Sequence, residues 1–467
     1  MKIRVTRHLA FLALIIGVGL VARFYIAPYT SGSDIAQFAG FTDTFISKTF
    51  CFLKYTSSES HVGENWPYPW PYPYGPLLVI LLSVPRMLAT TPVTHFWKDG
   101  VYYVYVPMDW IIASKSVFIL FDTLSALTIY LVVKPLSTRK ALLATGFYYL
   151  NPVTIYISSI YGMFDTVAFF PLAFSLLLFL RRSNGSLRDT VIVSSLAGLS
   201  VAVKPNVILP ALIIAAYACK PFQKDAKRII TGVLGFTTGL LITYVPFELT
   251  CPGGLLIYYS ALKSAGTPGY TPPLCYSFNG FSSLATYMNS KTGGDFTWVT
   301  ENWWMPAFLL SILLLWKMLK ERFNAEFAVE NIYTSYLIFL TTYWRVNYQY
   351  FAPMMGFTAI YFVSDRFNAY RRALSIAYSM YVMAWFFMFP VSWWGHAHIE
   401  NPNYNVMNLL DSISFMVFAE EAYLLYSIIL TLLGYVTLTA FLLPVKQKCS
   451  SQVLTDPQYP VLYLSLL

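Results

Sequence analysis

The sequence predicts an all-α, polytopic membrane protein with about 12 transmembrane helices. The 467 residues are 57% hydrophobic and only 11% charged, with a mean hydropathy of +0.55. This composition excludes an ordinary soluble globular domain. Apolar runs of about 20 residues, the length that crosses the hydrocarbon core of a bilayer, alternate with short basic clusters.

Most of the 31 Lys and Arg residues lie in seven such clusters. Basic clusters are typical of cytoplasmic loops, so we expect the chain to return to the cytoplasm at each one, with both termini inside. The net charge of +9 therefore requires no nucleic-acid partner. The clusters are Lys2/Arg4/Arg7, Lys134/Arg139/Lys140, Arg181/Arg182/Arg188, Lys220/Lys224/Lys227/Arg228, Lys317/Lys320/Arg322, Arg366/Arg371/Arg372 and Lys446/Lys448.

The first span is expected at 8–26, running outward. The next apolar stretch, 75–89, is short and contains Pro85 and Arg86. If it crossed, every later basic cluster would lie outside, so we expect a non-crossing helix at the outer interface. It belongs to a first outer loop at about 30–108. The other spans are expected at 109–133, 141–160, 164–180, 189–203, 205–219, 229–247, 303–316, 327–344, 347–364, 373–394 and 422–444.

This threading divides the chain into four parts. Residues 1–247 contain seven spans, and 248–302 form a second large outer loop. Residues 303–445 contain the C-terminal helices, and 446–467 form a cytoplasmic tail. Cys251 and Cys275 share the second loop and could form a disulfide. Cys51 is also expected outside, whereas Cys219 and Cys449 are expected in the cytoplasm.

An acidic residue, Asp34, stands at the start of the first outer loop. Ser33 is a plausible N-cap for a helix that begins at Asp34. Phe38, Phe41 and Phe45 then recur at helical spacing, which favours an amphipathic interfacial helix. Asp34 has two interpretations: a carboxylate that stabilises the helix N-terminus, or a general base.

Aromatic residues alternate with proline further along this loop, between Glu64 and Gly75. Proline fixes an extended backbone, which would present Trp70, Tyr72 and Tyr74 with little entropy to lose. The aromatic rings fit either a membrane-interface belt or stacking against sugar rings.

Other polar residues map to the outer ends of spans. Asp165 begins the fourth span, and Lys204 lies at the outer turn between the fifth and sixth. Arg345 lies with Asn347 and Gln349 between the ninth and tenth; its alternative role is a snorkelling side chain. An acid and several cations at one membrane surface suit a lipid-linked phosphate substrate, because cations bind phosphate and a carboxylate can accept a proton.

Two charged residues, Lys115 and Asp122, lie seven positions apart on the second span and so share one helix face. They fit a buried ion pair, although charges inside a membrane are also functional candidates.

Several ordered motifs resemble the GT-C superfamily of membrane glycosyltransferases over residues 1–365. Within it the chain is most similar to family 87-type polyprenyl-phosphate mannosyltransferases and to GPI-anchor mannosyltransferases. The motifs are Gly32-Ser33-Asp34, Trp70-Pro71-Tyr72-Pro73-Tyr74-Gly75-Pro76-Leu77, Asn151-Pro152, Tyr161-Gly162-Met163-Phe164-Asp165, Lys204-Pro205 and Val346-Asn347-Tyr348-Gln349-Tyr350-Phe351.

The resemblance implies a GT-C fold with seven conserved spans before the second outer loop and juxtamembrane helices in the first. It also implies Asp34 as catalytic base and a dolichyl- or undecaprenyl-phosphate sugar donor. Together with the charge analysis it gives the expected site: Asp34 and Asp165 as catalytic residues; Lys204, Arg345 and Lys115 at the donor phosphate; and Asp43, Glu64, Trp70, Tyr72, Tyr74, Asn347 and Gln349 at the sugar or acceptor.

Some relatives carry a spaced acidic pair in the first loop. Here the candidates, Asp34 and Asp43, are nine positions apart and form no compact metal motif. No metal ligand is assigned, and dependence on a divalent cation (Mg²⁺ or Mn²⁺) stays open.

The expected function is transfer of a hexose, mannose by resemblance, from a polyprenyl phosphate to a glycan, glycolipid or protein acceptor on the outer face, with inversion. A transporter or lipid flippase would favour internal repeats, which the sequence lacks; a non-catalytic subunit of a membrane complex would tolerate loss of Asp34. The absence of outer-face glycosylation sequons and of a retention signal favours a prokaryotic plasma membrane.

Overall fold

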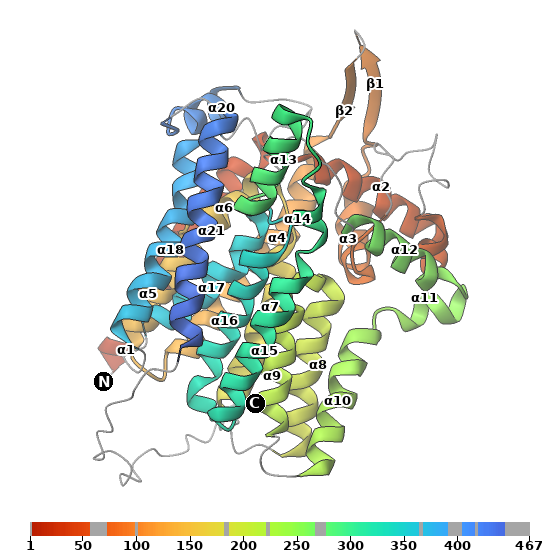
Figure 1. Ribbon diagram of the computed structural model, residues 1–467. Helices are drawn as coiled ribbons and strands as arrows, with labels where there is room; N and C mark the ends of the chain where they lie inside the picture. Colours follow the sequence, from red (N-terminus) through yellow and green to blue (C-terminus); the bar gives the residue numbers. More distant parts are fainter. Residues whose placement is uncertain are drawn as a thin grey trace.

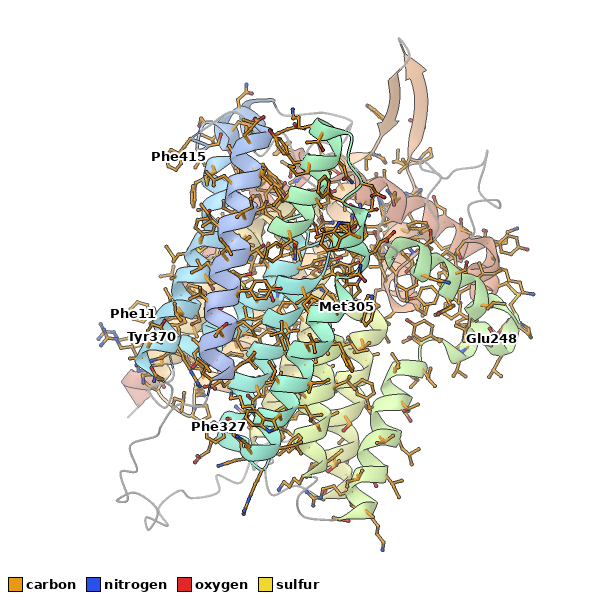
Figure 2. The ribbon with its side chains drawn as sticks, viewed as in Figure 1. Phe11, Glu248, Met305, Phe327, Tyr370 and Phe415 are labelled. Atoms are coloured by element: carbon orange, nitrogen blue, oxygen red, sulfur yellow. A yellow bond between two sulfur atoms is a disulfide. The ribbon has the colours of Figure 1, made fainter. Side chains whose placement is uncertain are left out.

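A computed structural model describes residues 2–56, 72–98, 101–181, 186–220, 225–266, 277–363, 368–390, 404–415 and 419–443. The expected sugar ligands Glu64 and Trp70, together with Cys275 and Cys449, lie outside these ranges. Long helices run side by side in one bundle, and shorter helices gather beside one end of it (Figure 1). Side chains fill the spaces between the helices, and Phe415 and Phe327 mark opposite ends of the bundle (Figure 2).

The N-terminal half of the bundle agrees with the expected spans to within several residues, except that the seventh helix ends earlier. Its helices are α1 (Lys2–Ile26), α4 (Met108–Val133), α5 (Thr138–Tyr149), α6 (Pro152–Ile155), α7 (Asp165–Arg181), α8 (Leu187–Val203), α9 (Ile208–Cys219) and α10 (Ala226–Leu241).

The expected third span, 141–160, is broken rather than continuous. Pro152 follows the end of α5, and the side chain of Asn151 caps α6 by accepting a hydrogen bond from the Val153 amide. The chain then continues as a π-helical segment, Tyr156–Tyr161. It ends at Gly162, whose φ of +83° is accessible to glycine at little cost. Such π-helical turns are often found at functional sites.

The C-terminal half is also helical. Its long helices are α15 (Trp304–Lys320), α16 (Ala328–Thr342), α17 (Phe351–Phe362), α18 (Ala369–Met388) and α21 (Glu420–Leu442), with a short α20 (Tyr404–Asp411). Lys317 in the last turn of α15 donates to Glu330 of α16 at 2.7 Å, and Arg371 of α18 also binds Glu330. These buried contacts fasten three helices together at the end marked by Phe327 (Figure 2).

Within the described ranges, four helical stretches are long and apolar enough to cross a membrane by length and composition: Arg7–Tyr29, Met108–Val133, Thr297–Lys320 and Glu420–Leu442. The other bundle helices are mostly shorter because prolines and polar turns interrupt them. The helical membrane fold therefore agrees with expectation, and the count of about 12 spans stays a prediction.

The first loop contains α2 (Ser33–Lys48), a 3₁₀ segment (Thr49–Tyr55), α3 (Pro76–Leu88) and a hairpin of β1 (Thr94–Lys98) and β2 (Val101–Tyr105). The expected helix at 75–89 is confirmed as α3. This short hairpin was not expected from the sequence, but among the described residues the fold is otherwise helical and the all-α class stands. The hairpin strands are antiparallel, with Thr94 opposite Tyr105.

The second loop contains α11 (Val245–Thr250), α12 (Gly254–Gly266), α13 (Gly280–Thr292) and α14 (Thr297–Glu301). Helices α11 and α12 pack against the 3₁₀ segment of the first loop (Figure 1), and Glu248 of α11 lies at the edge of this group (Figure 2).

A disulfide joins the two loops. It links Cys51 to Cys251, with 5.0 Å between their Cα atoms. The possible pairing of Cys251 with Cys275 is therefore not formed, because the fold brings the 3₁₀ segment of the first loop to α11. The ring of Phe247 packs against Phe45 and Phe50 beside this bond, so apolar contact and a covalent link hold the same junction.

Candidate active site

The carboxylate of Asp34 lies in the first turn of α2 and is half-buried. Its Oδ1 accepts the hydroxyl of Tyr74 and its Oδ2 accepts that of Tyr161, each at 3.0 Å. Tyr74 comes from the end of the aromatic–proline segment and Tyr161 from the end of the π-helical turn. Two distant segments therefore fix the orientation of this carboxylate.

The helix start differs slightly from expectation. Helix α2 begins at Ser33, and its N-cap is Gly32 without a side-chain cap, so the predicted Ser33 cap is wrong. The Gly32 amide instead donates to the Tyr161 carbonyl at 2.8 Å. This bond holds the beginning of α2 against the end of the π-helical turn.

Tyr74 remains a hydrogen-bond donor over the physiological pH range. Burial and the neighbouring Asp34 charge raise the pKa of Tyr74 well above its ordinary value. Gly75 fixes the position of this segment, because a Cβ there would lie only 1.6 Å from the Ala202 carbonyl oxygen of α8. The loop can approach α8 this closely only with glycine at the contact.

Asp165 and Lys204 form a buried ion pair next to Asp34. The Nζ of Lys204 lies 2.7 Å from Oδ2 of Asp165. Asp165 is the first residue of α7, and Lys204 lies in the break between α8 and the 3₁₀ segment Pro205–Val207. The ammonium also lies 4.7 Å from the ring centre of Phe164 and 5.0 Å from that of Tyr350, where cation–π attraction adds to the ion pair.

Tyr350 is a further aromatic residue beside the Asp165–Lys204 pair. It lies in a 3₁₀ turn, Tyr348–Tyr350, and its hydroxyl interacts electrostatically with Asp165, Arg345 and Asp34. Its ring also contacts Lys204. The charge of Asp34 in turn acts on both members of the Asp165–Lys204 pair. That Asp34, Asp165, Lys204 and Arg345 act at one site stays a prediction.

Tyr350 and Tyr161 were not selected from the sequence as site residues, although both lie inside motifs that were. Three polar residues close to Tyr350 in the sequence are buried to different extents. Asn347 is half-buried as the N-cap of the 3₁₀ turn, whereas Gln349 is buried. Arg345 is half-buried, with its guanidinium 5.9 Å from the Trp344 ring centre.

Two residues expected at the sugar or acceptor hold the loop together instead. Asp43 pairs with Arg86 of α3 through both carboxylate oxygens, at 2.6 and 2.9 Å. The Tyr72 ring is fully buried, and its hydroxyl donates to the Gly75 carbonyl at 2.7 Å. Tyr72 therefore has no exposed face for a sugar, whereas the Asp43 side chain keeps 33% exposure and its role at the sugar stays a prediction.

A metal shared by Asp34 and Asp43 does not fit the helix. Nine residues of α-helix separate them by about 13 Å. Within the described ranges, no group of three or more His, Cys, Asp and Glu side chains could hold a metal ion.

The Lys115–Asp122 ion pair is also a wrong expectation. Asp122 pairs with Arg23 of α1, both fully buried, and Arg23 donates as well to the Tyr149 carbonyl at 2.8 Å. Lys115 instead donates to backbone carbonyls of Ala27, Thr30 and Ile160. With its three protons occupied, Lys115 is not placed to bind a phosphate.

The arrangement combines a half-buried carboxylate held by two hydroxyl donors with two cations that share one tyrosine. Such a carboxylate can accept a proton from a hydroxyl, and the cations can stabilise a phosphate. The surrounding aromatic rings offer flat apolar faces.

A scan against protein-family models finds no matching family, and a search of curated proteins finds no relative. Among solved structures, the chain is similar to ArnT from Cupriavidus metallidurans bound to undecaprenyl phosphate, with a TM-score of 0.47 and 13% identity over 93% of this chain and 76% of that chain. It is also similar to the Archaeoglobus fulgidus oligosaccharyltransferase, with a TM-score of 0.40 and 13% identity over 94% and 57%.

Proposed function

We propose that the protein is a membrane glycosyltransferase that transfers a hexose from a polyprenyl phosphate to a hydroxyl of a glycan, glycolipid or protein. The observation that carries the proposal is the geometry around Asp34. A carboxylate held by Tyr74 and Tyr161 lies within electrostatic range of the Asp165–Lys204 pair. More specifically, we propose mannose as the hexose and a dolichyl group as the polyprenyl carrier; this part of the proposal rests on the sequence resemblance.

In this reaction the acceptor oxygen forms a bond to the anomeric carbon as the bond from that carbon to the phosphate oxygen breaks. Asp34 takes the acceptor proton, and the electron pair of the broken bond leaves with the lipid phosphate. A single displacement of this kind inverts the anomeric centre. The two tyrosine hydroxyls hold the carboxylate toward the acceptor, which saves the entropy of orienting it.

Lys204 and Arg345 would stabilise the charge on the departing phosphate. Asp165 lies behind Lys204 and is fully buried, so we assign it to holding the ammonium in place. Asn347, half-buried at the start of the 3₁₀ turn that contains Tyr350, is the candidate for binding the sugar or the acceptor. We place the site on the outer face of the membrane, following the charge distribution of the loops. The disulfide between the two outer loops suits an oxidising compartment.

The test is transfer of radiolabelled mannose from dolichyl-phosphate-mannose by the full chain in membranes, comparing wild type with Asp34→Asn. Loss of the general base should reduce the rate by about 100- to 10,000-fold. The matched control is Asp295→Asn, an exposed acid of the second loop. Equal rates for wild type and Asp34→Asn would exclude Asp34 as the base. Failure of wild type with every polyprenyl-phosphate sugar would refute the proposed activity.

A further inference from the structure

Lys115 is a buried cation whose hydrogen bonds all reach the ends of two other segments. Its side chain is fully buried in α4. The Nζ atom donates to the carbonyls of Ala27 and Ile160, each at 3.0 Å, to the Thr30 carbonyl, and to the Thr30 hydroxyl at 3.2 Å. Asp122, seven positions further along the same helix, is paired with Arg23.

The acceptors have a common origin. Ala27 and Thr30 follow the end of α1, and Ile160 lies in the last turn of the π-helical segment. Carbonyl groups at a helix C-terminus lack partners within the helix and carry the negative end of its dipole. One ammonium thus neutralises two helix ends that would otherwise repel each other.

These two ends lead directly into the site. The chain reaches Asp34 four residues after Thr30, and Tyr161 follows Ile160. Between them, the Gly32 amide donates to the Tyr161 carbonyl at 2.8 Å, and the Tyr161 hydroxyl donates to Asp34 at 3.0 Å. The Lys115 stem also closes the space around Gly162, where an added Cβ would lie 3.1 Å from its Cε.

We propose that Lys115 is a positioning residue: it clamps the end of α1 to the end of the π-helical turn and so sets the Tyr161–Asp34 hydrogen bond. The catalytic part of this inference rests on the proposed function. Lys115 does not touch substrate in this scheme and acts only through Tyr161 and Asp34. Its removal should therefore affect the rate of the chemical step more than donor binding.

The main variant is Lys115→Met, which keeps the length of the stem and removes the donors. We expect kcat to fall about 10- to 100-fold, the effect of a small misplacement of a catalytic group, with the donor KM changed by less than about two-fold. Lys115→Arg, which keeps charge and donors, should recover part of the loss. The matched control is Lys317→Met, a buried lysine at the other end of the bundle bound to Glu330 and Asn331.

A double variant tests whether Lys115 acts through Tyr161. If it does, Lys115→Met combined with Tyr161→Phe should be no slower than the worse single variant. A double variant slowed by the product of the two single losses would overturn the proposal. A raised donor KM at unchanged kcat in Lys115→Met would also overturn it. An activity loss matched by Lys317→Met would show general destabilisation instead.

Hydrogen–deuterium exchange gives a readout that needs no turnover. In Lys115→Met, exchange of the backbone amides in residues 30–36 should speed up at least about ten-fold as the clamp opens, and Lys317→Met should leave it unchanged. Unchanged exchange in Lys115→Met would overturn the clamp. If wild type shows no transfer activity but Lys115→Met still exchanges faster, the clamp is supported and the proposed function is refuted.

Discussion

The hydroxyl of Tyr161 donates to the carboxylate of Asp34 at 3.0 Å across 127 positions of sequence. With the bond from Tyr74 to the other oxygen, it holds both carboxylate oxygens of Asp34. A base held on both oxygens needs little reorganisation when the acceptor arrives.

Removing either hydroxyl should slow transfer. We expect Tyr161→Phe and Tyr74→Phe each to lower kcat about 10- to 100-fold, because a hydrogen bond to a charged group contributes about 1.5–3 kcal/mol. Steady-state kinetics of the purified variants measure this. Tyr259→Phe, at an exposed tyrosine of α12, is the control, and loss of activity there would point to an unspecific effect.

The Asp165–Lys204 pair allows stability and activity to be separated. Lys204→Met leaves a buried carboxylate without its partner, so we expect the free energy of unfolding to drop by about 3–5 kcal/mol and donor binding to weaken. Adding Asp165→Leu removes the unpaired charge. The double variant should regain most of the stability but not donor affinity, as thermal unfolding and donor titration would report. Recovered affinity in the double variant would remove Lys204 from the phosphate site.

The pH dependence of stability should carry a contribution from Tyr74. Its pKa is raised in the folded protein, so its stabilising contribution is complete below the unfolded pKa of about 10 and is lost as the pH rises above it. The midpoint temperature of thermal unfolding should therefore fall more steeply between pH 9 and pH 11 for wild type than for Tyr74→Phe. Parallel curves for the two proteins would contradict this assignment.

The disulfide makes a prediction about peptides. Digestion without reduction should release a linked pair containing Cys51 and Cys251, identified by mass spectrometry, and no pair of Cys251 with Cys275. Cys51→Ser should lower stability by about 2–5 kcal/mol and loosen the first loop, seen as faster proteolysis there. Cys219→Ser, at a free buried cysteine, should leave the first loop intact.

Charged residues could be located from the sequence because they are rare in this chain and costly in a membrane. Asp34, Asp165, Lys204 and Arg345 stand out for that reason, and in the structure Lys204 pairs with Asp165 and lies against the Tyr350 ring. Their tyrosine partners could not be singled out, because the sequence has 36 tyrosines and helical spacing does not say which hydroxyl meets which carboxylate.

The partners of Lys115 and Asp122 were predicted wrongly for the same reason: helical spacing does not show which groups of distant segments will meet them. Lys115 and Asp122 share a helix face, but the broken third span brings a carbonyl to Lys115, and α1 brings Arg23 to Asp122.

The hairpin, in contrast, could have been predicted from the sequence. Asp99-Gly100 separates two runs rich in aromatic and β-branched residues, which is a strong hairpin pattern.

The bond between Cys51 and Cys251 also orders events during biosynthesis. The two cysteines are separated by 200 positions, and chains grow at about 5–20 residues per second, so Cys51 waits roughly 10–40 s for its partner to be made. During that interval α2 and Asp34 have already been translated, while α11, which will pack against the neighbouring 3₁₀ segment, has not. The nascent first loop is then the segment most exposed to wrong thiol partners and to membrane chaperones.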